Sequence, residues 1–398
     1  MNGFNCEYDV AVAGGGVAGV AAALAAARRG HRVALVEKQF IIGGLATGGL
    51  VLIYLPLCDG SGEQVTFGIA EELLKASMKY SPCDLPPAWG GPENGHLGFR
   101  GGKRYQVMFS PAGFTLAMDE LLRDAGVDLW LDTLVTEVRL NRDGAVSALG
   151  VDNISGHGTI GARCFVDATG SAALVRLGGG KVFTSDNRYM PWIMEAPPDK
   201  PHYELSPGVG VHVFGHADDN FAGDALDART HTAYIRQVWA DSRERYDRIY
   251  RDGGDRRRVF PVKLPTMPQL RKIARIDGTV TLGDGDELRR FDDSVGLFGD
   301  WRCKDKVWET PYGALLPRDL GGVLAAGRCI GAAGDAWEAF RVIPSGAMTG
   351  EAAGVAAALA VETGRPPAEV KAGEVREVLR PNGFLFHIDE LKNSRYKE

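Results

Sequence analysis

Hydrophobic and polar positions near the start of the chain predict a regular order of elements. Residues 8–13 (YDVAVA) are a short apolar run, which is typical of a parallel strand buried on both faces. Residues 17–29 (VAGVAAALAAARR) are rich in alanine and end in two arginines, which favours a helix. Gly30 then ends the helix, and residues 31–37 (HRVALVE) form a second apolar run. The pattern predicts strand, glycine-rich turn, helix and strand.

The turn between the first strand and the helix has the spacing Gly-x-Gly-x-x-Gly. In a chain with 53 glycines among 398 residues, this spacing arises by chance about once, and residues 156–161 (GHGTIG) also match it. The second match has no helix after it and is predicted to belong to a hairpin. In the first match, Gly14 permits a tight turn, Gly16 lets the backbone approach a pyrophosphate, and Gly19 lets helix and strand pack closely.

An acidic residue closes the second predicted strand. Glu37 follows Gly19 by 18 residues, and an acid at this place accepts hydrogen bonds from both ribose hydroxyls of a dinucleotide, with Lys38 beside it. The start of the helix, at Val17 and Ala18, offers unpaired N–H groups and a positive dipole end to the phosphates. Turn, helix and acid together predict a dinucleotide site.

Residues 43–49 (GGLATGG) indicate which kind of dinucleotide. An NAD-binding domain continues here with another crossover helix, but glycine costs about 1 kcal/mol per helix position relative to alanine. Four glycines in seven residues predict a loop with few side chains, which suits close passage along a long, extended cofactor. The expected contacts in this loop are Gly43, Gly44, Leu45, Ala46 and Thr47.

Further apolar segments extend the same domain. Residues 128–140 (DLWLDTLVTEVRL) alternate as one strand, and residues 163–170 (RCFVDATG) form a buried strand that ends in small residues. Residues 322–326 are another apolar strand. The last segment is a helix that begins after Pro344 and Ser345 and ends at Gly364. Its Gly350 and Gly354 lie four apart on one face, so another backbone, or a flavin, can come very near.

Taken together, these motifs resemble the FAD-dependent oxidoreductases with a glutathione-reductase-type flavin domain. The flavoprotein subunits of fumarate reductase and succinate dehydrogenase are more distant relatives. The resemblance is carried by residues 43–49, 68–74 (GIAEELL), 165–170 (FVDATG) and 324–360. It implies FAD as the cofactor and an α/β fold with a Rossmann-like FAD-binding domain and an inserted α+β substrate domain. The expected boundaries are 1–50, 115–175 and 310–364 for the FAD-binding domain, 51–114 and 176–309 for the substrate domain, and 365–398 for a C-terminal helical tail.

The resemblance also implies contacts to the rest of the cofactor. The backbone of Val135 and Thr136 is expected against the adenine. The strand before residue 171 ends in the small residues Ala168, Thr169 and Gly170, which would permit close approach of the cofactor. The alternative for Thr169 is a plain strand end without a cofactor contact. Gly327 and Arg328 follow the next strand. The family often has an acid there, against the ribityl chain or the pyrophosphate. Arg328 is a cation and suits the pyrophosphate, and Asp335 is a second candidate for the ribityl contact.

The glycine- and alanine-rich helix is expected to point its N-terminus at the pyrimidine edge of the isoalloxazine. Its positive dipole end would stabilise the negative charge that the flavin gains on reduction. The N–H donors are expected from Gly346, Ala347 and Met348. The alternative is a helix that only packs on the sheet.

Candidate catalytic residues come from two segments. In the fumarate reductase relatives, the stretch that matches Arg341 carries an arginine that holds a substrate carboxylate, so a planar fork of donors is expected here. An ion pair with Glu338 is the alternative. His212 and His216 lie on a predicted strand, and either could take a proton from a hydroxyl or amine. Their alternative is a surface or core position.

The expected reaction moves a hydride between a small organic substrate and flavin N5. A second Gly-x-Gly-x-x-Gly unit with its flanking strand and helix is missing from the sequence, so electrons come from the substrate or from an unidentified transient carrier. Residues 166–176 and 334–344 faintly resemble the paired flavin motifs of aromatic hydroxylases, which leaves a monooxygenase as an alternative. A non-catalytic flavin-bearing subunit or redox sensor is the other.

Charge and composition exclude several other classes. The net charge of −6 and the pI near 5.8 argue against nucleic acid or an anionic membrane as the main partner. The sequence shows neither an apolar run of membrane-spanning length nor a signal peptide's layout, so a cytoplasmic location is expected. The six cysteines form neither a redox pair nor a metal-binding spacing, and no metal is expected. A homodimer is expected by analogy with related flavoproteins.

Overall fold

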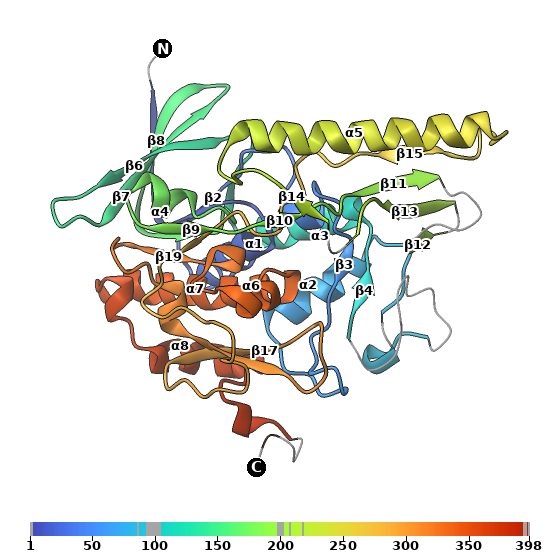
Figure 1. Cartoon of the computed structure of the whole chain (residues 1–398). Coiled ribbons are helices and arrows are strands. Elements are labelled where there is room, and N and C mark those ends of the chain that lie inside the picture. Colours follow the sequence, from blue (N-terminus) through green and yellow to red (C-terminus); the bar gives the residue numbers. More distant parts are fainter. Residues whose placement is uncertain are drawn as a thin grey trace.

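A mostly parallel sheet forms the centre of the computed structural model, which describes residues 3–85, 87–92, 105–196, 203–206, 208–216, 219–392 and 396. The spatial order of its strands is β5 (Asp128–Trp130), β2 (Val33–Val36), β1 (Phe4–Ala13), β8 (Gly156–Asp167), β7 (Val146–Asn153) and β6 (Leu134–Leu140), with β19 (Val323–Ala325) paired to the end of β8 (Figure 1). The pairs from β5 to β8, and β8 with β19, are parallel, whereas β6, β7 and β8 form an antiparallel meander. The expected α/β class and the hairpin at residues 156–161 are confirmed.

The helices α1 (Val17–Ala27) and α7 (Ile343–Thr363) pack on each other and on this sheet. A Cβ on Gly350 would lie 2.2 Å from the Ala18 carbonyl oxygen, and one on Gly354 would lie 2.3 Å from that of Ala22. The partner that the two glycines were predicted to admit is therefore the backbone of α1. Gly364, at φ 67°, ends α7 as predicted.

The single strand predicted over residues 128–140 is wrong, because the chain forms two strands there. Asp132 adopts a left-handed conformation with φ 48°, and the N–H groups of Asp132 and Thr133 donate to the carbonyls of Gln39 and Glu37. This turn separates β5, which continues the parallel sheet, from β6, which starts the meander. The hydrophobic pattern could not predict this turn, because residues other than glycine adopt the left-handed conformation only occasionally.

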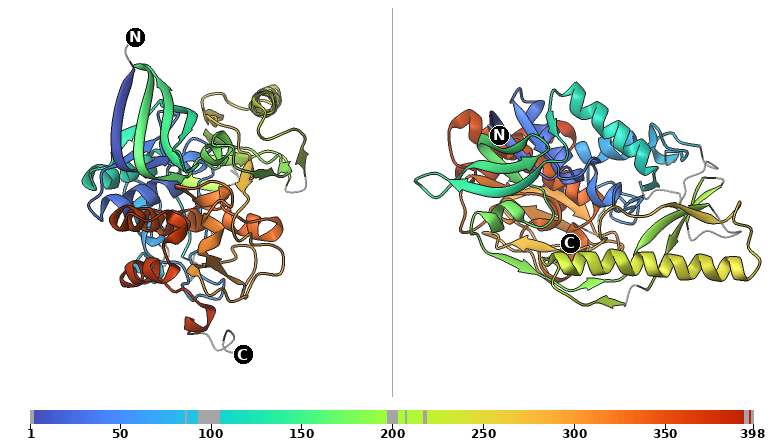
Figure 2. Two further views of the ribbon diagram at one scale, coloured as in Figure 1. Left: turned by 90° about the vertical axis from the view of Figure 1, so that its left-hand side faces the viewer. Right: turned by 90° about the horizontal axis from the view of Figure 1, so that it is seen from above.

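A second unit with an antiparallel sheet adjoins the central sheet and is called the cap here. Its strand order is β12 (Tyr203–Ser206), β13 (Val209–Val213), β11 (Trp192–Ala196) and β15 (Phe260–Lys263). The long helix α5 (Ala228–Arg251) packs on it and projects with it beyond the rest of the molecule (Figure 2). The buried Glu195 of β11 joins the two, since it accepts hydrogen bonds from Arg245 and Tyr246 of α5.

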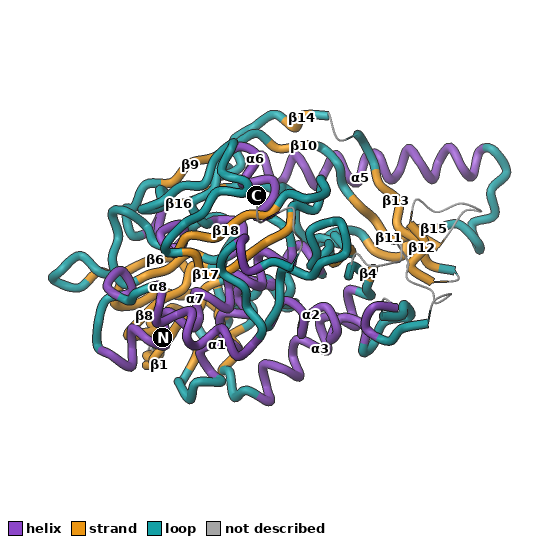
Figure 3. The backbone as a smooth tube through the Cα atoms, turned by 90° about the horizontal axis from the view of Figure 1, so that it is seen from below, coloured by secondary structure: helices purple, strands orange, loops and turns teal. Residues whose placement is uncertain are grey.

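Smaller elements complete the fold (Figure 3). The paired strands are β3 (Ile53–Tyr54) with β4 (Val107–Met108), β9 (Val182–Thr184) with β16 (Ala274–Ile276), β10 (Asn187–Arg188) with β14 (Asn220–Phe221), and β17 (Ser294–Gly299) with β18 (Val307–Pro311). The remaining helices are α2 (Ile69–Met78), α3 (Pro111–Asp124), α4 (Ala173–Leu177), α6 (Gly334–Phe340) and α8 (Ala372–Leu379). The predicted C-terminal tail contains α8, which packs on α7. The domain boundaries stay a prediction.

The longest apolar helix of the described chain, α7, lies in the core. Within the described ranges, no single helix is both long and apolar enough to cross a membrane, and α6 and α7 meet that test only as a pair bent by 88°. Most of α7 is buried inside the protein.

A buried carboxyl of α7 gives the fold a pH dependence. Glu351 accepts hydrogen bonds from the Ile69 N–H at 2.6 Å and from the Asn382 side chain at 2.9 Å, and it thus joins α7 to α2 and to the C-terminal segment. Burial raises its pKa from 4.5 to about 7. Between these two values the folded protein holds a proton that the unfolded chain has released, so this group lowers stability as pH rises.

In the wild type, we expect Glu351 to lower the free energy of unfolding by about 1–3 kcal/mol between about pH 5 and about pH 8. Glu351→Gln should lack this contribution. Urea unfolding of both proteins at the two pH values measures this difference. The exposed Glu369→Gln serves as the control and should leave the pH dependence unchanged. An equal pH dependence in wild type and Glu351→Gln would contradict the assignment.

Candidate cofactor and substrate site

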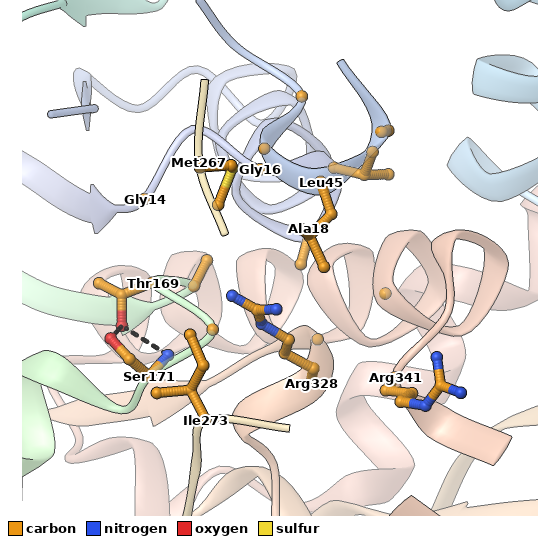
Figure 4. Close-up of a pocket in the computed structure, with 18 of the residues that line it drawn as sticks. Gly14, Gly16, Ala18, Leu45, Thr169, Ser171, Met267, Ile273, Arg328 and Arg341 are labelled. Carbon is orange, nitrogen blue, oxygen red and sulfur yellow. Dashed lines mark hydrogen bonds between the residues drawn. The ribbon is translucent and has the colours of Figure 1, made fainter. Parts of the chain in front are cut away.

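A groove runs along the carboxyl ends of the parallel strands (Figure 4). The residues that directly follow β1, β2, β8 and β19 all line it, as does the start of α7. Its empty space is about 1060 Å³ when counted out to the open mouth. Open α/β sheets bind ligands at this edge, because the strand ends leave a crevice there.

The glycine turn forms one wall of the groove. Gly14 has φ 96°, and a Cβ there would lie 2.6 Å from the Ala168 carbonyl oxygen. A Cβ on Gly19 would lie 1.8 Å from the Gly14 oxygen, so Gly19 serves helix packing and does not line the groove. Gly16 differs, because a Cβ there would meet nothing within 4 Å.

Gly16 is also the N-cap of α1, and no side chain caps this helix end. The first N–H groups of a helix have no partner within it, and they carry its positive dipole end. An open backbone position beside an uncapped helix N-terminus fits a pyrophosphate, since a Cβ would occupy the space that the phosphates need.

Glu37 is fixed at the next strand end. One carboxylate oxygen accepts the Gly15 N–H at 2.7 Å and the other accepts the Gln39 N–H at 2.9 Å. Burial raises the pKa of this side chain, which is only 8% exposed. Each carboxylate oxygen can accept more than one hydrogen bond, so Glu37 keeps acceptors for a ribose.

The loop after Glu37 passes close to the glycine turn. The Gly43 N–H donates to the Gly15 carbonyl at 2.7 Å, and a Cβ on Gly44 would lie 3.3 Å from the Gly16 Cα. Thr47 does not line the groove, since its side chain is buried and donates to the Ile42 carbonyl at 2.5 Å. The loop therefore brings backbone, and few side chains, against the turn.

The end of β8 is shaped by the buried Asp167. Its carboxylate accepts hydrogen bonds from the Thr169 hydroxyl at 2.7 Å and from the Leu174 N–H at 2.8 Å. The Thr169 hydroxyl thus has a structural role in this turn, although the residue also lines the groove. Gly170 leaves space for the next wall, because a Cβ there would lie 2.3 Å from Arg328 Nε.

The N-terminus of α7 differs from the expectation. The helix begins at Ile343, with Pro344 in its first turn, so the predicted start after Ser345 is wrong. Proline is tolerated in a first turn because an N–H there needs no partner. The Gly346 N–H already donates to the Val342 carbonyl at 2.9 Å, and Ala347 and Met348 are buried in the helix and do not line the groove.

The donor role predicted for Gly346 is therefore wrong, and those predicted for Ala347 and Met348 have no geometric support. The N–H groups ahead of Gly346 in this helix belong to Ile343 and Ser345, since Pro344 has none. Of these residues, Ile343 and Gly346 line the groove.

Basic side chains line the end of the groove near α7. Arg328 Nη1 donates to the Leu270 carbonyl at 2.6 Å, and burial lowers the pKa of Arg328 to about 10, so it stays charged. Arg341 Nε donates to Glu338 at 2.6 Å, and Lys272 lies 2.8 Å from the same carboxylate. Burial alone would raise the pKa of Glu338, but the charges of Arg341 and Lys272 outweigh burial and bring it to about 2.

Many residues predicted from the sequence come together in this groove. The predicted cofactor contacts that line it are Gly14, Gly16, Val17, Ala18, Glu37, Lys38, Gly43, Gly44, Leu45, Ala46, Ala168, Thr169, Gly170, Gly327, Arg328 and Gly346. Arg341 also lines it, and its predicted ion pair with Glu338 is present as well.

Other predicted residues lie elsewhere. Val135 and Thr136 belong to β6 in the antiparallel meander and do not line the groove. Asp335 pairs with Arg302 at 2.8 Å and has a half-exposed side chain. His212, on β13 of the cap, packs against Phe214, and His216 is exposed beyond that strand. Neither histidine lines the groove, so these roles have no support from the geometry.

The sequence did not identify one wall of the groove. Residues 266–273, called the strap here, cross it with Met267, Pro268 and Ile273 as lining residues. The Thr266 N–H donates to the Gly48 carbonyl at 2.9 Å, and Gln269 donates to that of Gly49. A proline-rich turn was the only signal in this segment, and it points to no ligand.

His231, in the first turn of α5, is a further lining residue that sequence reasoning missed. Its Nε2 lies 2.7 Å from the Ala225 carbonyl oxygen. A carbonyl only accepts, so Nε2 carries the hydrogen and Nδ1 is the acceptor of the neutral ring.

The chain is similar to known flavoproteins over most of its length. The model of a family described as FAD dependent oxidoreductase matches residues 9–248 and 221–379. A segment of 48 residues, 12% of the chain, is 52% identical to the thiamine thiazole synthase of Desulfosudis oleivorans. The match spans 19% of that relative's length.

Solved structures with a similar fold include two proteins of different names. One is a geranylgeranyl bacteriochlorophyll reductase-like protein from Thermoplasma acidophilum (15% identity, TM-score 0.50, covering 95% of this chain and 83% of that one). The other is p-nitrophenol 4-monooxygenase from Pseudomonas putida (14% identity, TM-score 0.51, covering 94% and 84%). Such low identities concern the fold alone, and these two do not single out a glutathione-reductase-type domain. From the family match, the chain belongs to the FAD-dependent oxidoreductases, and its cofactor is FAD.

Proposed function

We propose that this enzyme is a dehydrogenase or reductase that acts on a small organic substrate. The observation that carries the proposal is that the cofactor groove is also lined by side chains outside the glycine turn and the strand ends, namely Arg341, His231 and Met267, Pro268 and Ile273 of the strap. When bound, FAD supplies hydride transfer at its N5 atom.

The groove residues divide between the parts of the cofactor. Glu37 would bind the adenosine ribose, and the start of α1 with Arg328 would bind the pyrophosphate. The loop over 43–46 and the start of α7 would hold the flavin end, where the first-turn N–H of Ile343 adds a positive dipole end.

The cap side would hold the substrate. Arg341 lines the groove and is oriented by Glu338, so it can position a polar group of the substrate. Met267 and Pro268 of the strap are apolar lining residues and would exclude water from the groove. His231 replaces His212 and His216 as our candidate base, because its Nδ1 is an acceptor and the residue lines the groove.

Anaerobic reduction of the bound flavin tests this proposal. Alcohols, amino acids and polyols are added to the oxidised holoenzyme, and enoates to the reduced one, while the visible flavin absorbance is followed. We expect at least one compound to bleach or restore the colour, and Arg341→Met to weaken that response while FAD stays bound.

Two outcomes would replace the proposal. Oxygen uptake that yields a hydroxylated product would indicate the monooxygenase alternative. A bound flavin that none of these compounds reduces or oxidises would indicate a non-catalytic subunit or a redox sensor.

A further inference from the structure

The strap is bonded to two different walls of the cofactor groove. At its start, the Thr266 N–H donates to the Gly48 carbonyl at 2.9 Å, and Gly48 belongs to the loop over residues 43–49 that passes the glycine turn. Farther along, the Leu270 carbonyl accepts a hydrogen bond from Arg328 Nη1 at 2.6 Å. Arg328 follows β19 and lines the groove. The strap therefore reaches from the wall of the glycine loop to the wall at the end of β19.

Lys272 holds the far end of the strap. The Asn187 side chain, from β10, accepts the Lys272 N–H at 2.9 Å and donates to the Lys272 carbonyl at 2.6 Å. The Lys272 ammonium lies 2.8 Å from Glu338 of α6. The strap is thus held at several points along its length, by main-chain and side-chain groups of distant segments.

Gln269 joins the middle of the strap to two other segments with one side chain. Its Nε2 donates to the Gly49 carbonyl and, at 3.0 Å, to the Trp192 carbonyl, while its Oε1 accepts the Trp192 N–H at 2.7 Å. Trp192 is the first residue of β11 in the cap, and Gln269 is only 1% exposed. An apolar side chain in place of Gln269 would remove a hydrogen-bond partner from three backbone groups, which is costly in a buried place.

The strap faces the groove with apolar side chains. Met267, Pro268 and Ile273 line it together with the glycine turn and the strand ends (Figure 4). These three side chains offer neither a charge for a phosphate nor an acceptor for a ribose hydroxyl. A cofactor that contacts the other walls lies against them, so their contribution is to cover it.

We infer that the strap retains bound FAD, which enters and leaves the groove only when the strap lifts, and that Gln269 is the positioning residue that holds the strap in place. The inference goes beyond the proposed function and does not depend on which reaction the flavin performs. A covering segment that must open slows both the entry and the release of a ligand. A looser strap therefore speeds both steps, and a locked strap slows them.

The rates of FAD release and association in Gln269→Leu test the role of this residue, with flavin fluorescence as the readout. We expect release about tenfold or more faster than in wild type, and association at least as fast, because the strap loses its bonds to Gly49 and Trp192. A general folding defect would instead slow association while release became faster, and that result would remove Gln269 from the scheme. Gln237→Leu is the control, since Gln237 is exposed on α5 and donates to Asp241 of the same helix. It should match wild type.

A disulfide tests the strap in the opposite direction. A Cβ on Gly48 would lie 2.9 Å from Thr266 Oγ1. In a disulfide, the Cβ of one cysteine is about 3 Å from the sulfur of the other, because the S–S bond is about 2.05 Å long. The end of the Gln39 side chain, 3.0 Å from the same Cβ, is flexible and can turn aside. The double variant Gly48→Cys/Thr266→Cys should therefore bind the strap covalently to the glycine loop when it is oxidised.

We expect the oxidised double variant to release FAD about tenfold or more slowly than the same protein after reduction with dithiothreitol. The loss of two free thiols on oxidation shows that the disulfide has formed. A destabilised fold would release FAD faster, so slower release has no merely structural explanation. Gly48→Cys and Thr266→Cys alone are the controls, and each should release FAD at one rate before and after reduction. Release that the disulfide does not slow would overturn the inference, since FAD would then leave without movement of the strap.

Discussion

Gly16→Asp is expected to abolish FAD binding while the apoprotein stays folded. Gly16 has φ −66° and ψ 173°, a conformation open to any residue, and a Cβ there would meet nothing within 4 Å. Aspartate is a good N-cap and should stabilise α1 by a few tenths of a kcal/mol. Its carboxylate, however, would stand where the pyrophosphate binds, so charge and volume both oppose the cofactor.

We expect the affinity for FAD to fall by at least about 100-fold, which is about 2.7 kcal/mol. Quenching of flavin fluorescence measures the affinity, and urea unfolding of the apoprotein measures stability. Gly373→Asp is the control, since Gly373 lies in the first turn of another helix, α8, and a Cβ there would also meet nothing within 4 Å. Wild-type affinity in Gly16→Asp would show that the cofactor binds elsewhere.

Gly354→Val is expected to destabilise the whole fold. A Cβ at this position would lie 2.3 Å from the Ala22 carbonyl oxygen of α1, and backbone cannot turn away as a flexible side chain can. α1 and α7 must then separate, and their starts form opposite walls of the groove. We expect a loss of about 3 kcal/mol or more in the free energy of unfolding, together with weaker FAD binding.

Chemical unfolding of the holoprotein and the apoprotein measures both effects. Gly373→Val, which introduces the same side chain into open space, should cost only about 1 kcal/mol or less. A Gly354→Val protein as stable as Gly373→Val would mean that α1 and α7 are not in backbone contact.

The cofactor half of the site could be predicted because its signals are local. The turn around Gly14 and Gly16, and the acid at Glu37, fall within one strand–helix–strand unit, so their spacing carries the geometry. The strand ends at Ala168 and Gly327 were found in the same way. Each follows an apolar run that can only be a buried strand.

The substrate half could not be predicted, because its contacts join distant segments. The strap reaches the groove through hydrogen bonds from Thr266 and Gln269 to Gly48 and Gly49, and nothing in residues 266–273 marks that partnership. His231 lies in the first turn of an exposed helix with no motif around it. Two predicted boundaries were also wrong. The turn at the left-handed Asp132 divides residues 128–140 into two strands, and α7 begins early enough to include Pro344 in its first turn. Contacts with distant segments decide such boundaries, and a local pattern does not record them.

The packing of α1 against α7 also affects how the protein is made. Every residue of α1 is buried, largely beneath a helix that starts at Ile343. A nascent polypeptide therefore emerges from the ribosome with this alanine-rich surface uncovered until most of the chain has been translated. During that interval it is exposed to aggregation and is a natural client for molecular chaperones.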